Sequence, residues 1–201
     1  MTDNISTVIS DSEIQPVDFY LFTRATLEKF LKDQFDLPPY KALQLFQWVY
    51  KRRVEDFSLM SDIARDLREK FEKVFFFPKA TTQSREISSD GTRKYLFEVE
   101  SSDSVESVMI KQTNRMTLCV SSQVGCGMGC KFCRTATMGL KRHLTSSEII
   151  RQVLGVIDDA KNFDDMFSNV VFMGMGEPLH NLPSISCLLY TSPSPRDRQK
   201  S

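Results

Sequence analysis

The stretch that decides the fold of this chain reads RMTLCVSSQVGCGMGCKFC at residues 115–133, followed by TSSEIIRQVLGVI at 145–157 and NVVFMGMGEP at 169–178. The first part starts as a strand pattern and runs into a loop rich in cysteine and glycine. In the second part, Thr145 and Glu148 form the capping-box pattern that opens an amphipathic helix. The third part reads as a buried strand that ends in a glycine-rich turn. Strand, loop, helix and strand make one βαβ unit, so we expect an α/β fold in which a parallel sheet begins here.

Three cysteines of this stretch, Cys126, Cys130 and Cys133, lie within eight residues. Thiolates at the spacing CxxxCxxC can bind three irons of a four-iron cluster and leave the fourth iron open to a small molecule. Zinc sites and ferredoxin clusters more often use paired CxxC units or runs of four cysteines. The spacing, with an aromatic residue before the last cysteine, is similar to the cluster motif of radical S-adenosylmethionine (SAM) enzymes. A zinc site completed by Cys119 is the alternative that the residues leave open.

Composition sets limits on the class of protein. Of 201 residues, 41% are hydrophobic and 26% are charged, which is ordinary for a chain with a packed core. Five cysteines is an odd number, and three of them are too close together for a disulfide framework. The chain starts without a charged-then-apolar secretory pattern, and no apolar run approaches the roughly 20 residues of a membrane span. We expect a soluble protein of the reducing cytoplasm with no membrane partner.

The net charge is zero, but the basic residues are unevenly distributed. Between Ser107 and Ser147 there is no Asp or Glu, while six cations occur there: Lys111, Arg115, Lys131, Arg134, Lys141 and Arg142. A run of this kind creates a local positive field that can hold phosphates, and it surrounds the three cysteines. A solvated face is the alternative interpretation of the same run.

The N-terminal part has helical periodicity. Residues 1–16 are polar and aperiodic, and we expect them to be disordered. Apolar stripes then predict amphipathic helices over 23–35, 40–53 and 61–75, with Ser61 or Asp62 as the cap of the third. The stripes consist of Leu27, Phe30, Leu31 and Gln34, then Ala42, Leu45, Phe46 and Val49, then Ile63, Leu67, Lys70 and Phe71. We expect a small helical domain over 17–78 in which Phe46, Trp48, Tyr50 and Phe57 belong to the core.

Beyond Pro78 the period changes to two. The segments at 93–100, 106–111 and 115–122 predict an antiparallel meander whose last strand leads into the cysteine loop. The α/β domain is expected to cover 79–186. After Ser186 the sequence CLLYTSPSPRDRQKS shows neither helical nor strand periodicity and resembles translated cloning sequence, so we treat 187–201 as a non-native tail and give Cys187 no role.

From about Leu37 to Leu182 the chain resembles the radical SAM adenine-C2 methyltransferases that modify large-subunit ribosomal RNA and tRNA. The segments that carry the resemblance are WVYKRRVEDFSLMSDIARDLREKF at 48–71, VESVMI at 105–110, LCVSSQVGCGMGCKFCRTATMG at 118–139 and NVVFMGMGEPLHNL at 169–182. The resemblance implies a radical SAM partial (β/α) barrel, truncated after its first βα units, behind a small N-terminal helical domain.

The resemblance also implies a role for particular residues. Cys126, Cys130 and Cys133 would ligate a [4Fe-4S] cluster, and SAM would bind at a turn formed by Gly174, Met175, Gly176 and Glu177. Glu106 corresponds to the proton acceptor, and Cys119 to the thiol that resolves a protein–RNA adduct through a disulfide bond. From the residues alone, Cys119 reads as a small buried hydrophobe and Glu106 as a solvent-facing side chain. His143 and His180 show no metal-ligand spacing and receive no role.

The implied partners are 23S rRNA, tRNA and a flavodoxin-like electron donor, with the protein acting as a monomer. The cysteine that carries the methyl group lies further downstream in the family than Ser201. We therefore expect this 201-residue polypeptide to be unable to methylate RNA although it can assemble a cluster; turnover of adenine to 2-methyladenine would contradict this. Two alternatives stay open: a C8-methylating radical SAM relative, and a non-catalytic zinc-binding RNA module.

Overall fold

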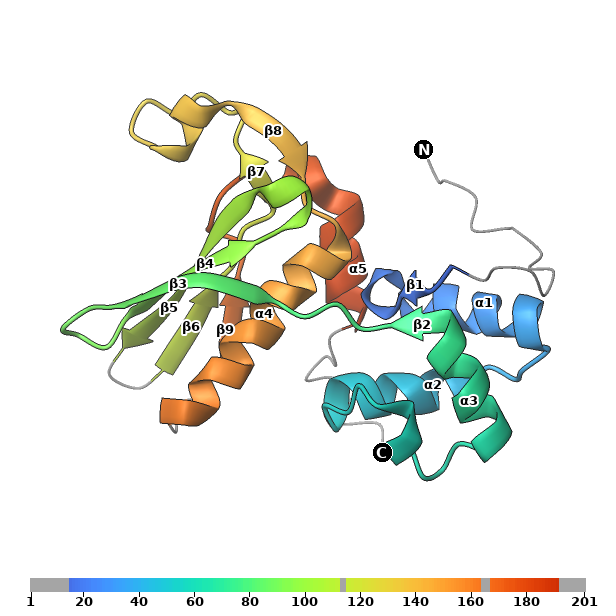
Figure 1. Ribbon diagram of the computed structural model, residues 1–201. Coiled ribbons are helices and arrows are strands. Elements are labelled where there is room, and N and C mark those ends of the chain that lie inside the picture. Colours follow the sequence, from blue (N-terminus) through green and yellow to red (C-terminus); the bar gives the residue numbers. More distant parts are fainter. Residues whose placement is uncertain (1–14, 113–114, 164–166, 192–201) are drawn as a thin grey trace. The chain divides into compact units, whose positions relative to one another are not determined.

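The computed structural model describes residues 15–112, 115–163 and 167–191. The chain divides into two compact units, one that comprises residues up to Phe77 and those from Tyr190, and one that runs from Pro78 to Leu189 (Figure 1). Nearly all of the N-terminal segment that we expect to be disordered, residues 1–14, lies outside the described ranges.

The first unit, over its described residues, combines short helices with a two-stranded parallel ribbon. Thr23 opens the first helix as a reciprocal cap, because Thr23 Oγ1 accepts from the Thr26 N–H at 3.1 Å and Thr26 Oγ1 accepts from the Thr23 N–H at 2.9 Å. The elements in order are β1 (Val17–Asp18), η1 (Phe19–Leu21), α1 (Arg24–Phe35), α2 (Tyr40–Phe46), the π-helical turn η2 (Gln47–Lys51), η3 (Phe57–Leu59), α3 (Arg65–Val74) and β2 (Phe75–Phe76).

The first predicted helix is confirmed, the second is α-helical only to Phe46 and π-helical to Lys51 instead of continuing to residue 53, and the start of the third is wrong. Seven of the residues predicted to form apolar stripes on the first two helices are buried: Leu27, Phe30, Leu31, Ala42, Leu45, Phe46 and Val49. The third helix begins only at Arg65, with Ala64 rather than Ser61 or Asp62 at the capping position. Asp62 instead accepts a hydrogen bond from Trp48 Nε1 at 2.5 Å, so its carboxylate is already engaged.

Aromatic side chains fill the core of the first unit. Phe19 is fully buried, and its ring lies 5.6 Å from that of Phe75 and 5.1 Å from that of Phe77. Such tilted and edge-on pairs add roughly 0.5–1.5 kcal/mol each beyond the area they bury. The predicted core aromatics Phe46, Trp48 and Phe57 are buried. Tyr50 is only half-buried.

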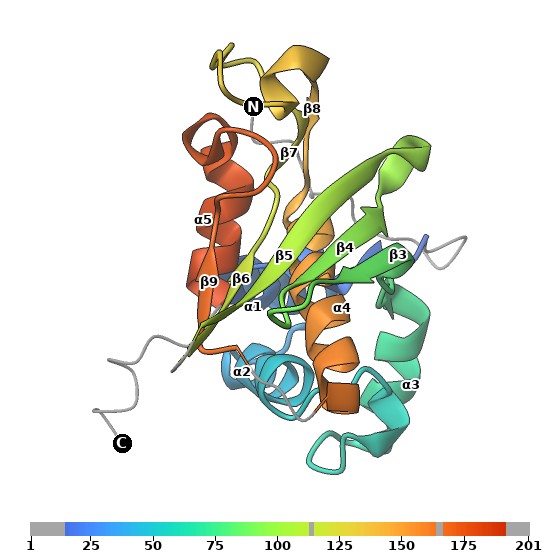
Figure 2. The same ribbon diagram turned by 90° about the vertical axis from the view of Figure 1, so that its left-hand side faces the viewer.

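A five-stranded sheet with the order β3-β4-β5-β6-β9 forms the centre of the second unit (Figure 2). The strands are β3 (Thr81–Ile87), β4 (Arg93–Glu98), β5 (Ser104–Gln112), β6 (Arg115–Cys119) and β9 (Asn169–Val171). The antiparallel meander of β4, β5 and β6 is confirmed. β6 and β9 pair in parallel, as the βαβ pattern predicts, with Cys119 opposite Val171. The polar strand β3 carries no period-two apolar signal and was not predicted.

Helix α4 (Ser146–Ala160) packs on one face of this sheet. Thr145 and Glu148 form the predicted capping box at its start. Gly155 lets the helix approach closely, because a Cβ there would lie 2.8 Å from a ring carbon of Phe97. The hydrophobic core to which this packing contributes consists of Tyr95, Phe97, Val99, Val105, Met109, Met116, Leu118, Val120, Val124, Leu144, Ile149, Val156, Met175 and Ile185.

The remaining strands of the second unit form a separate two-stranded sheet that follows β6 along the chain. β7 (Gln123–Gly125) and β8 (Leu140–His143) form an antiparallel hairpin, and Figures 1 and 2 both show its loop projecting beyond the sheet. The loop ends in η5 (Thr135–Met138); η6 (Lys161–Phe163) follows α4, and η7 (Pro178–Asn181) leads into α5 (Leu182–Thr191).

Two expectations about the C-terminal part are corrected. β9 was expected to be buried, but Asn169 and Val170 are exposed because β9 is the edge strand of the described sheet. The expectation that helical structure is absent after Ser186 is wrong for 187–191, which continue α5. The rest of that tail, residues 192–201, lies outside the described ranges.

Candidate functional site

The loop of residues 126–139, here called the cysteine loop, is fixed at its base by a close backbone approach. The Cys126 N–H donates to the Gly139 carbonyl oxygen at 2.9 Å. Gly125 has φ of +76°, and a Cβ on it would lie 1.9 Å from the same oxygen. A residue with a Cβ fits neither this left-handed conformation nor the space left by the Gly139 oxygen. The hairpin therefore closes only with glycine at position 125.

The three cysteines differ in their surroundings. Cys126 is buried at the loop base, Cys130 is exposed and Cys133 is half-buried. The Cys133 N–H donates to the Cys130 carbonyl oxygen at 3.0 Å, so these two cysteines share one turn. Hydrogen bonds from the backbone N–H groups of Ala136 and Thr135 lower the pKa of the Cys133 thiol. Among the described residues, no three Cys, His, Asp or Glu side chains lie close enough together to hold a metal ion.

Residues 174–177, here called the glycine turn, follow β9 and are bonded to the segment that precedes the cysteine loop. The Ser122 and Gln123 N–H groups both donate to the Met175 carbonyl oxygen, at 2.9 and 3.2 Å. The Met175 N–H donates to Ser121 Oγ at 2.8 Å. Gly174 is required by contact, since its Cβ would lie 2.7 Å from Ser121 Oγ. The structure thus brings the glycine turn beside the entrance to the cysteine loop.

Glu177 has a local role in this arrangement. Its Oε1 accepts a hydrogen bond from the Leu179 N–H at 3.1 Å, which caps η7. The Glu177 N–H donates to Gln123 Oε1 at 2.8 Å. The last residue of the glycine turn and the backbone that follows it are therefore fixed by hydrogen bonds.

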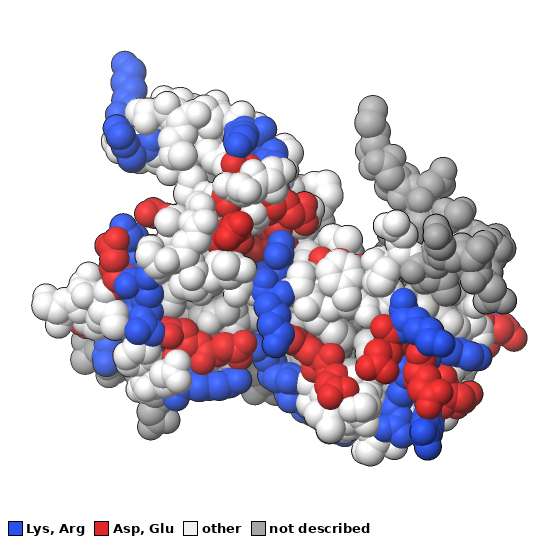
Figure 3. Space-filling view, in the orientation of Figure 1, with Lys and Arg blue, Asp and Glu red and all other residues white. Residues whose placement is uncertain are grey.

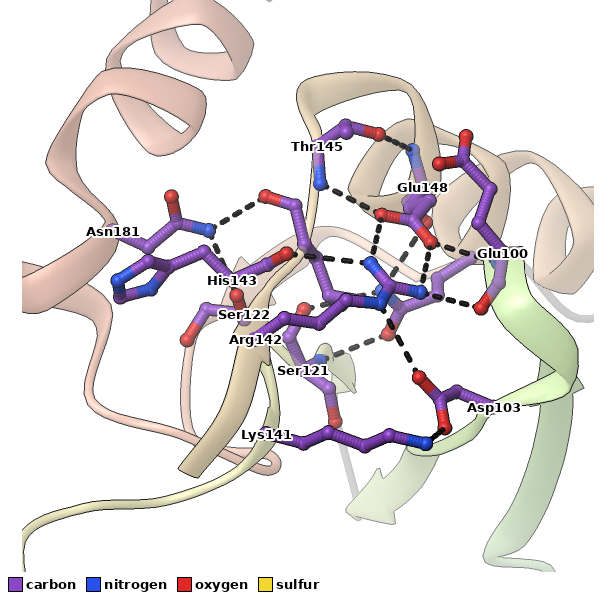
Figure 4. Close-up of polar contacts among 12 residues, drawn as sticks. Glu100, Asp103, Ser121, Ser122, Lys141, Arg142, His143, Thr145, Glu148 and Asn181 are labelled. Atoms are coloured by element: carbon purple, nitrogen blue, oxygen red, sulfur yellow. Dashed lines mark hydrogen bonds and ion pairs between the residues drawn. The ribbon is translucent and has the colours of Figure 1, made fainter. Parts of the chain in front are cut away.

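Buried amides beneath these segments were not predicted from the sequence. Gln152 of α4 accepts from the Ser121 N–H at 2.9 Å and donates to the Ser121 carbonyl oxygen at 3.1 Å. Asn181 donates to the carbonyl oxygens of Ser122 and Leu144, both at 2.8 Å (Figure 4). Together with Gln123 they form what we call the amide layer, and all three residues are at most 4% exposed. No motif marks these residues, because isolated Gln and Asn are common in any chain.

Glu106 and Cys119, the predicted proton acceptor and resolving thiol, lie on the face of the sheet opposite α4. Val108 pairs with Cys119, and Glu106 is two residues from Val108 on the same strand. Alternation along the strand puts all three on one face, where diagonal neighbours lie about 7 Å apart. Glu106 is exposed and ion-paired with Lys94 at 3.5 Å. The structure brings the two predicted residues to one face.

The thiol of Cys119 is shielded from solvent. Cys119 is 7% exposed. Burial raises the pKa of this thiol, and a hydrogen bond from the Met173 N–H opposes the shift only in part. The resting thiol is therefore protonated at neutral pH.

The long run of basic residues is broken up by acids from outside it. Arg142 donates to both carboxylate oxygens of Glu148, at 2.9 and 2.8 Å, and to the Glu100 carbonyl oxygen at 2.7 Å (Figure 4). Its Nε lies 3.3 Å from Asp103, which is also paired with Lys141. The expectation that both cations help form a phosphate-holding field is corrected, because the sheet folds Asp103 and Glu148 against them.

The carboxylate of Glu148 is held ionised by this arrangement. Burial acts to raise the pKa of Glu148, but the hydrogen bonds from Arg142 and from the N–H groups of Thr145 and Glu100 outweigh it. Its pKa consequently lies below the ordinary value. Glu148 thus joins the start of α4 to β8 and to the turn between β4 and β5.

Of the six cations, Lys131 and Arg134 remain exposed on the cysteine loop. Neither has an ion-pair partner among the described residues that surround the loop. Figure 3 shows blue Lys and Arg side chains toward the tip of the loop that joins β7 and β8. The positive charge near the cysteines is therefore confined to the loop itself.

Comparisons with known proteins extend these observations. Residues 17–76 match the family model of the ribosomal RNA large subunit methyltransferase N-terminal domain. The solved structure of a radical SAM methyltransferase from Sphaerobacter thermophilus superposes with a TM-score of 0.73 at 34% identity, over 88% of this chain and 52% of that one. The fold of the chain is thus the α/β fold of radical SAM methyltransferases.

Sequence relatives identify the family within the radical SAM methyltransferases to which the chain belongs. The dual-specificity RNA methyltransferase RlmN of Pelobacter propionicus is 43% identical over 171 residues, which are 85% of this chain and 48% of that protein. RlmN of Geobacter sulfurreducens is 47% identical over 146 residues, or 73% of this chain and 39% of that protein. The chain belongs to the RlmN family. It spans less than half the length of each of these two relatives. Within the described residues, no helix is long and apolar enough to cross a membrane.

Proposed function

We propose that this chain forms the cluster-binding part of a radical SAM methyltransferase that methylates C2 of adenine in 23S rRNA and tRNA. The observation that carries the proposal is the juxtaposition of two segments. The glycine turn is bonded to residues 121–123, and the same short stretch of chain, residues 121–126, runs directly into the cysteine loop. An electron-transferring cluster and the cofactor that it reduces have to lie side by side, and this stretch supports both.

The donor set suits an iron–sulfur cluster. Cys126, Cys130 and Cys133 are thiols without a disulfide partner, and thiolates are the ligands that such clusters use. Cys133 already accepts backbone hydrogen bonds that favour its thiolate form. A cluster held by these three cysteines would leave one iron open to SAM and would supply the electron that reduces it. Cys130 and Cys133 share one turn of the loop, and the three thiols would have to come closer together to hold a cluster.

The glycine turn is the proposed SAM site. Gly174 is exposed and Gly176 and Glu177 are half-buried, and hydrogen bonds to Ser121, Ser122 and Gln123 fix the backbone of the turn before any ligand arrives. A fixed backbone loses little entropy when it binds a ligand. One Glu177 oxygen is engaged in capping η7.

Glu106 and Cys119 are the proposed catalytic residues for the substrate. Glu106 is exposed, so its carboxylate can accept the C2 proton of an adenine that is turned out of its stack. Cys119 has to lose its proton before its sulfur can attack the cysteine sulfur that is joined through a methylene group to the adenine; an S–S bond then forms, the S–CH2 bond breaks, and the released methylene carbon takes the electron pair and a proton. Because burial holds the thiol protonated, a base must take that proton after the substrate has bound. The position of both residues on one sheet face supports their joint action.

The finer organisation is proposed on the same basis. Residues 17–78 form a helical accessory domain that binds RNA, and residues 79–186 form the first part of a partial (β/α) barrel. The exposed edge strand β9 supports continuation of a parallel sheet beyond it. The proposed partners are rRNA, tRNA and a flavodoxin-like reductant, with a monomeric protein in the cytoplasm. A non-native origin of 187–201 stays a prediction.

The experiment that tests the function uses a protein that extends this chain to the length of its relatives. It is incubated anaerobically with SAM, reductant and rRNA or tRNA fragments, and the nucleosides are separated by mass-resolved chromatography. We expect 2-methyladenosine; 8-methyladenosine would favour the C8-methylating alternative, and unmodified RNA would contradict the proposal. Cys119→Ala should trap a covalent RNA adduct, while the matched control Cys187→Ala should turn over normally.

A further inference from the structure

Gln123 occupies the point at which the cysteine loop and the glycine turn meet. It lies on β7, three residues before Cys126, and its side chain is fully buried. Its backbone N–H donates to the Met175 carbonyl oxygen at 3.2 Å. Burying an amide is unfavourable unless its polar atoms are bonded, so the contacts of this side chain indicate what it is there to hold.

The carbonyl end of the Gln123 side chain holds the glycine turn. Gln123 Oε1 accepts the Glu177 N–H at 2.8 Å. Gly176 has φ of +104°, and a Cβ on it would lie 2.6 Å from Gln123 Cβ. The turn is therefore shaped against this one side chain, both by a hydrogen bond and by contact.

The amide end of the same side chain is held by His143. Gln123 Nε2 lies 3.0 Å from His143 Nδ1. Because the Glu177 N–H can only donate, the atom that it meets must be the carbonyl oxygen, and the other end must be the NH₂ group. His143 Nδ1 must then accept, which places the ring proton on Nε2. His143, on β8 at the far side of the cysteine loop, thus sets the orientation of Gln123.

We propose that Gln123, oriented by His143, is a positioning residue that fixes the glycine turn for SAM beside the cluster. The inference rests on the proposed function, since it assumes that the turn binds SAM. It adds residues that neither touch the cluster nor belong to the turn. Loss of the Gln123 amide should loosen the turn while the cysteines keep their own anchor, the Cys126–Gly139 backbone bond.

The test compares the 201-residue chain with its Gln123→Met, Gln123→Glu and His143→Gln variants after anaerobic cluster reconstitution. The matched control is Gln83→Met, because Gln83 is an exposed glutamine on β3 whose side chain bonds only to Ser104 among the described contacts. Iron and sulfide content and the unfolding temperature report on structure. SAM affinity is measured from the change of the reduced cluster's electron paramagnetic resonance spectrum as SAM is added.

We expect Gln123→Met to keep its iron and sulfide but to bind SAM at least tenfold more weakly. Gln123→Glu keeps an acceptor for the Glu177 N–H and should recover most of the affinity, while His143→Gln should lose about threefold. Two results would overturn the inference. The first is a joint fall of the unfolding temperature and the iron content in all three variants, because a role in general stability alone would produce it. The second is an unchanged SAM affinity in Gln123→Met. If Gln123→Met does not fold, His143→Gln decides on the same criteria. A wild-type chain that holds a cluster but shows no response to SAM would overturn the assignment of the turn and the inference with it.

Discussion

The cysteine loop and the amide layer beneath it are built in opposite ways. The loop carries the residues proposed to bind the cluster, and beyond the buried Cys126 it is largely exposed, with Phe132 at 94% exposure and Cys130 exposed as well. The amide layer of Gln123, Gln152 and Asn181 is buried, and the polar ends of these side chains are bonded to backbone or to neighbouring side chains. The loop has few contacts to lose when it closes on a ligand, while the amide layer keeps the base of the loop in place.

This difference separates two tasks. Residues that take part in chemistry need access to a cofactor, and access requires exposure before the cofactor binds. Residues that place them need rigidity, and in a buried position rigidity comes from hydrogen bonds that are costly to break. Substitutions of the exposed cysteines should therefore abolish cluster binding without loss of stability, while substitutions in the buried layer should change how the neighbouring segments are held.

The largest effect is expected for Gly125→Ala at the boundary of the two regions. The added Cβ would meet the Gly139 oxygen at 1.9 Å, and the left-handed conformation adds about 1–2 kcal/mol of its own. We expect the hairpin to open, with a loss of more than about 2 kcal/mol in the free energy of unfolding and no cluster after reconstitution. The control is Gly129→Ala on the loop, which has φ of +67° but no atom within 4 Å of the added Cβ. Similar losses in both variants, measured by urea denaturation, would contradict the distinction.

Glu148→Gln tests the buried charge that joins the hairpin to α4. The substitution leaves Arg142 with Asp103 as its carboxylate partner, and we expect a loss of about 2–3 kcal/mol, below the usual range for a fully buried pair because Arg142 keeps Asp103 and partial access to solvent. The pKa of Glu148 is lowered, so the stability that it contributes is present above its ordinary pKa and is lost as the pH falls through the folded value. The variant should therefore lose part of the acid dependence of unfolding. Glu100→Gln, whose contacts in this cluster come from the backbone, serves as control. An unchanged acid limb in Glu148→Gln would argue against the lowered pKa.

Cys119 should react slowly with iodoacetamide at neutral pH although it is a free thiol. Burial raises its pKa, so the thiolate that reacts becomes populated only above the ordinary value of about 8.5. We expect the alkylation rate of the peptide that contains Cys119, followed by mass spectrometry, to rise about tenfold per pH unit from 7 to 9. The exposed Cys130 provides an internal standard for accessibility. A fast, pH-independent reaction of Cys119 would show that the thiol is neither buried nor protonated.

The smallest effect is expected for the exposed cations of the cysteine loop. Each of Lys131→Ala and Arg134→Ala should weaken binding of a single-stranded RNA by a few-fold and reduce the salt slope by about one, as expected for a phosphate contact. Lys141→Ala is the control, because Lys141 is already paired with Asp103. Fluorescence anisotropy over a range of salt concentrations measures both quantities. An equal effect of Lys141→Ala would restore the interpretation of the whole basic run as one RNA-binding surface.

The sequence alone was sufficient to predict the elements and residues that a local pattern determines. The capping box of Thr145 and Glu148 located the start of α4, and alternation located β4, β5 and β6. The three cysteines were found from their spacing alone. Each of these features depends on residues that are close together along the chain.

Features that depend on contacts between distant segments were missed. Asp103 and Glu148 neutralise Arg142 and Lys141 only after the sheet has formed, so the charge run looked longer than it is. Ser61 and Asp62 looked like caps, but Asp62 bonds to Trp48 on another part of the bundle. The roles of Gln123 and Asn181 depend on partners 54 and 59 residues away. No local pattern contains that information.

Chemical analysis of the reconstituted 201-residue chain tests the central claim most directly. After anaerobic incubation with iron and sulfide, the account predicts about four irons and four sulfides per chain, with the absorption and reduced paramagnetic spectrum of a [4Fe-4S] cluster. Cys130→Ser should lose this cluster, and Cys187→Ser should keep it. Bound zinc without labile sulfide, or a cluster that survives in Cys130→Ser, would contradict the assignment of the cysteine loop as the cluster site.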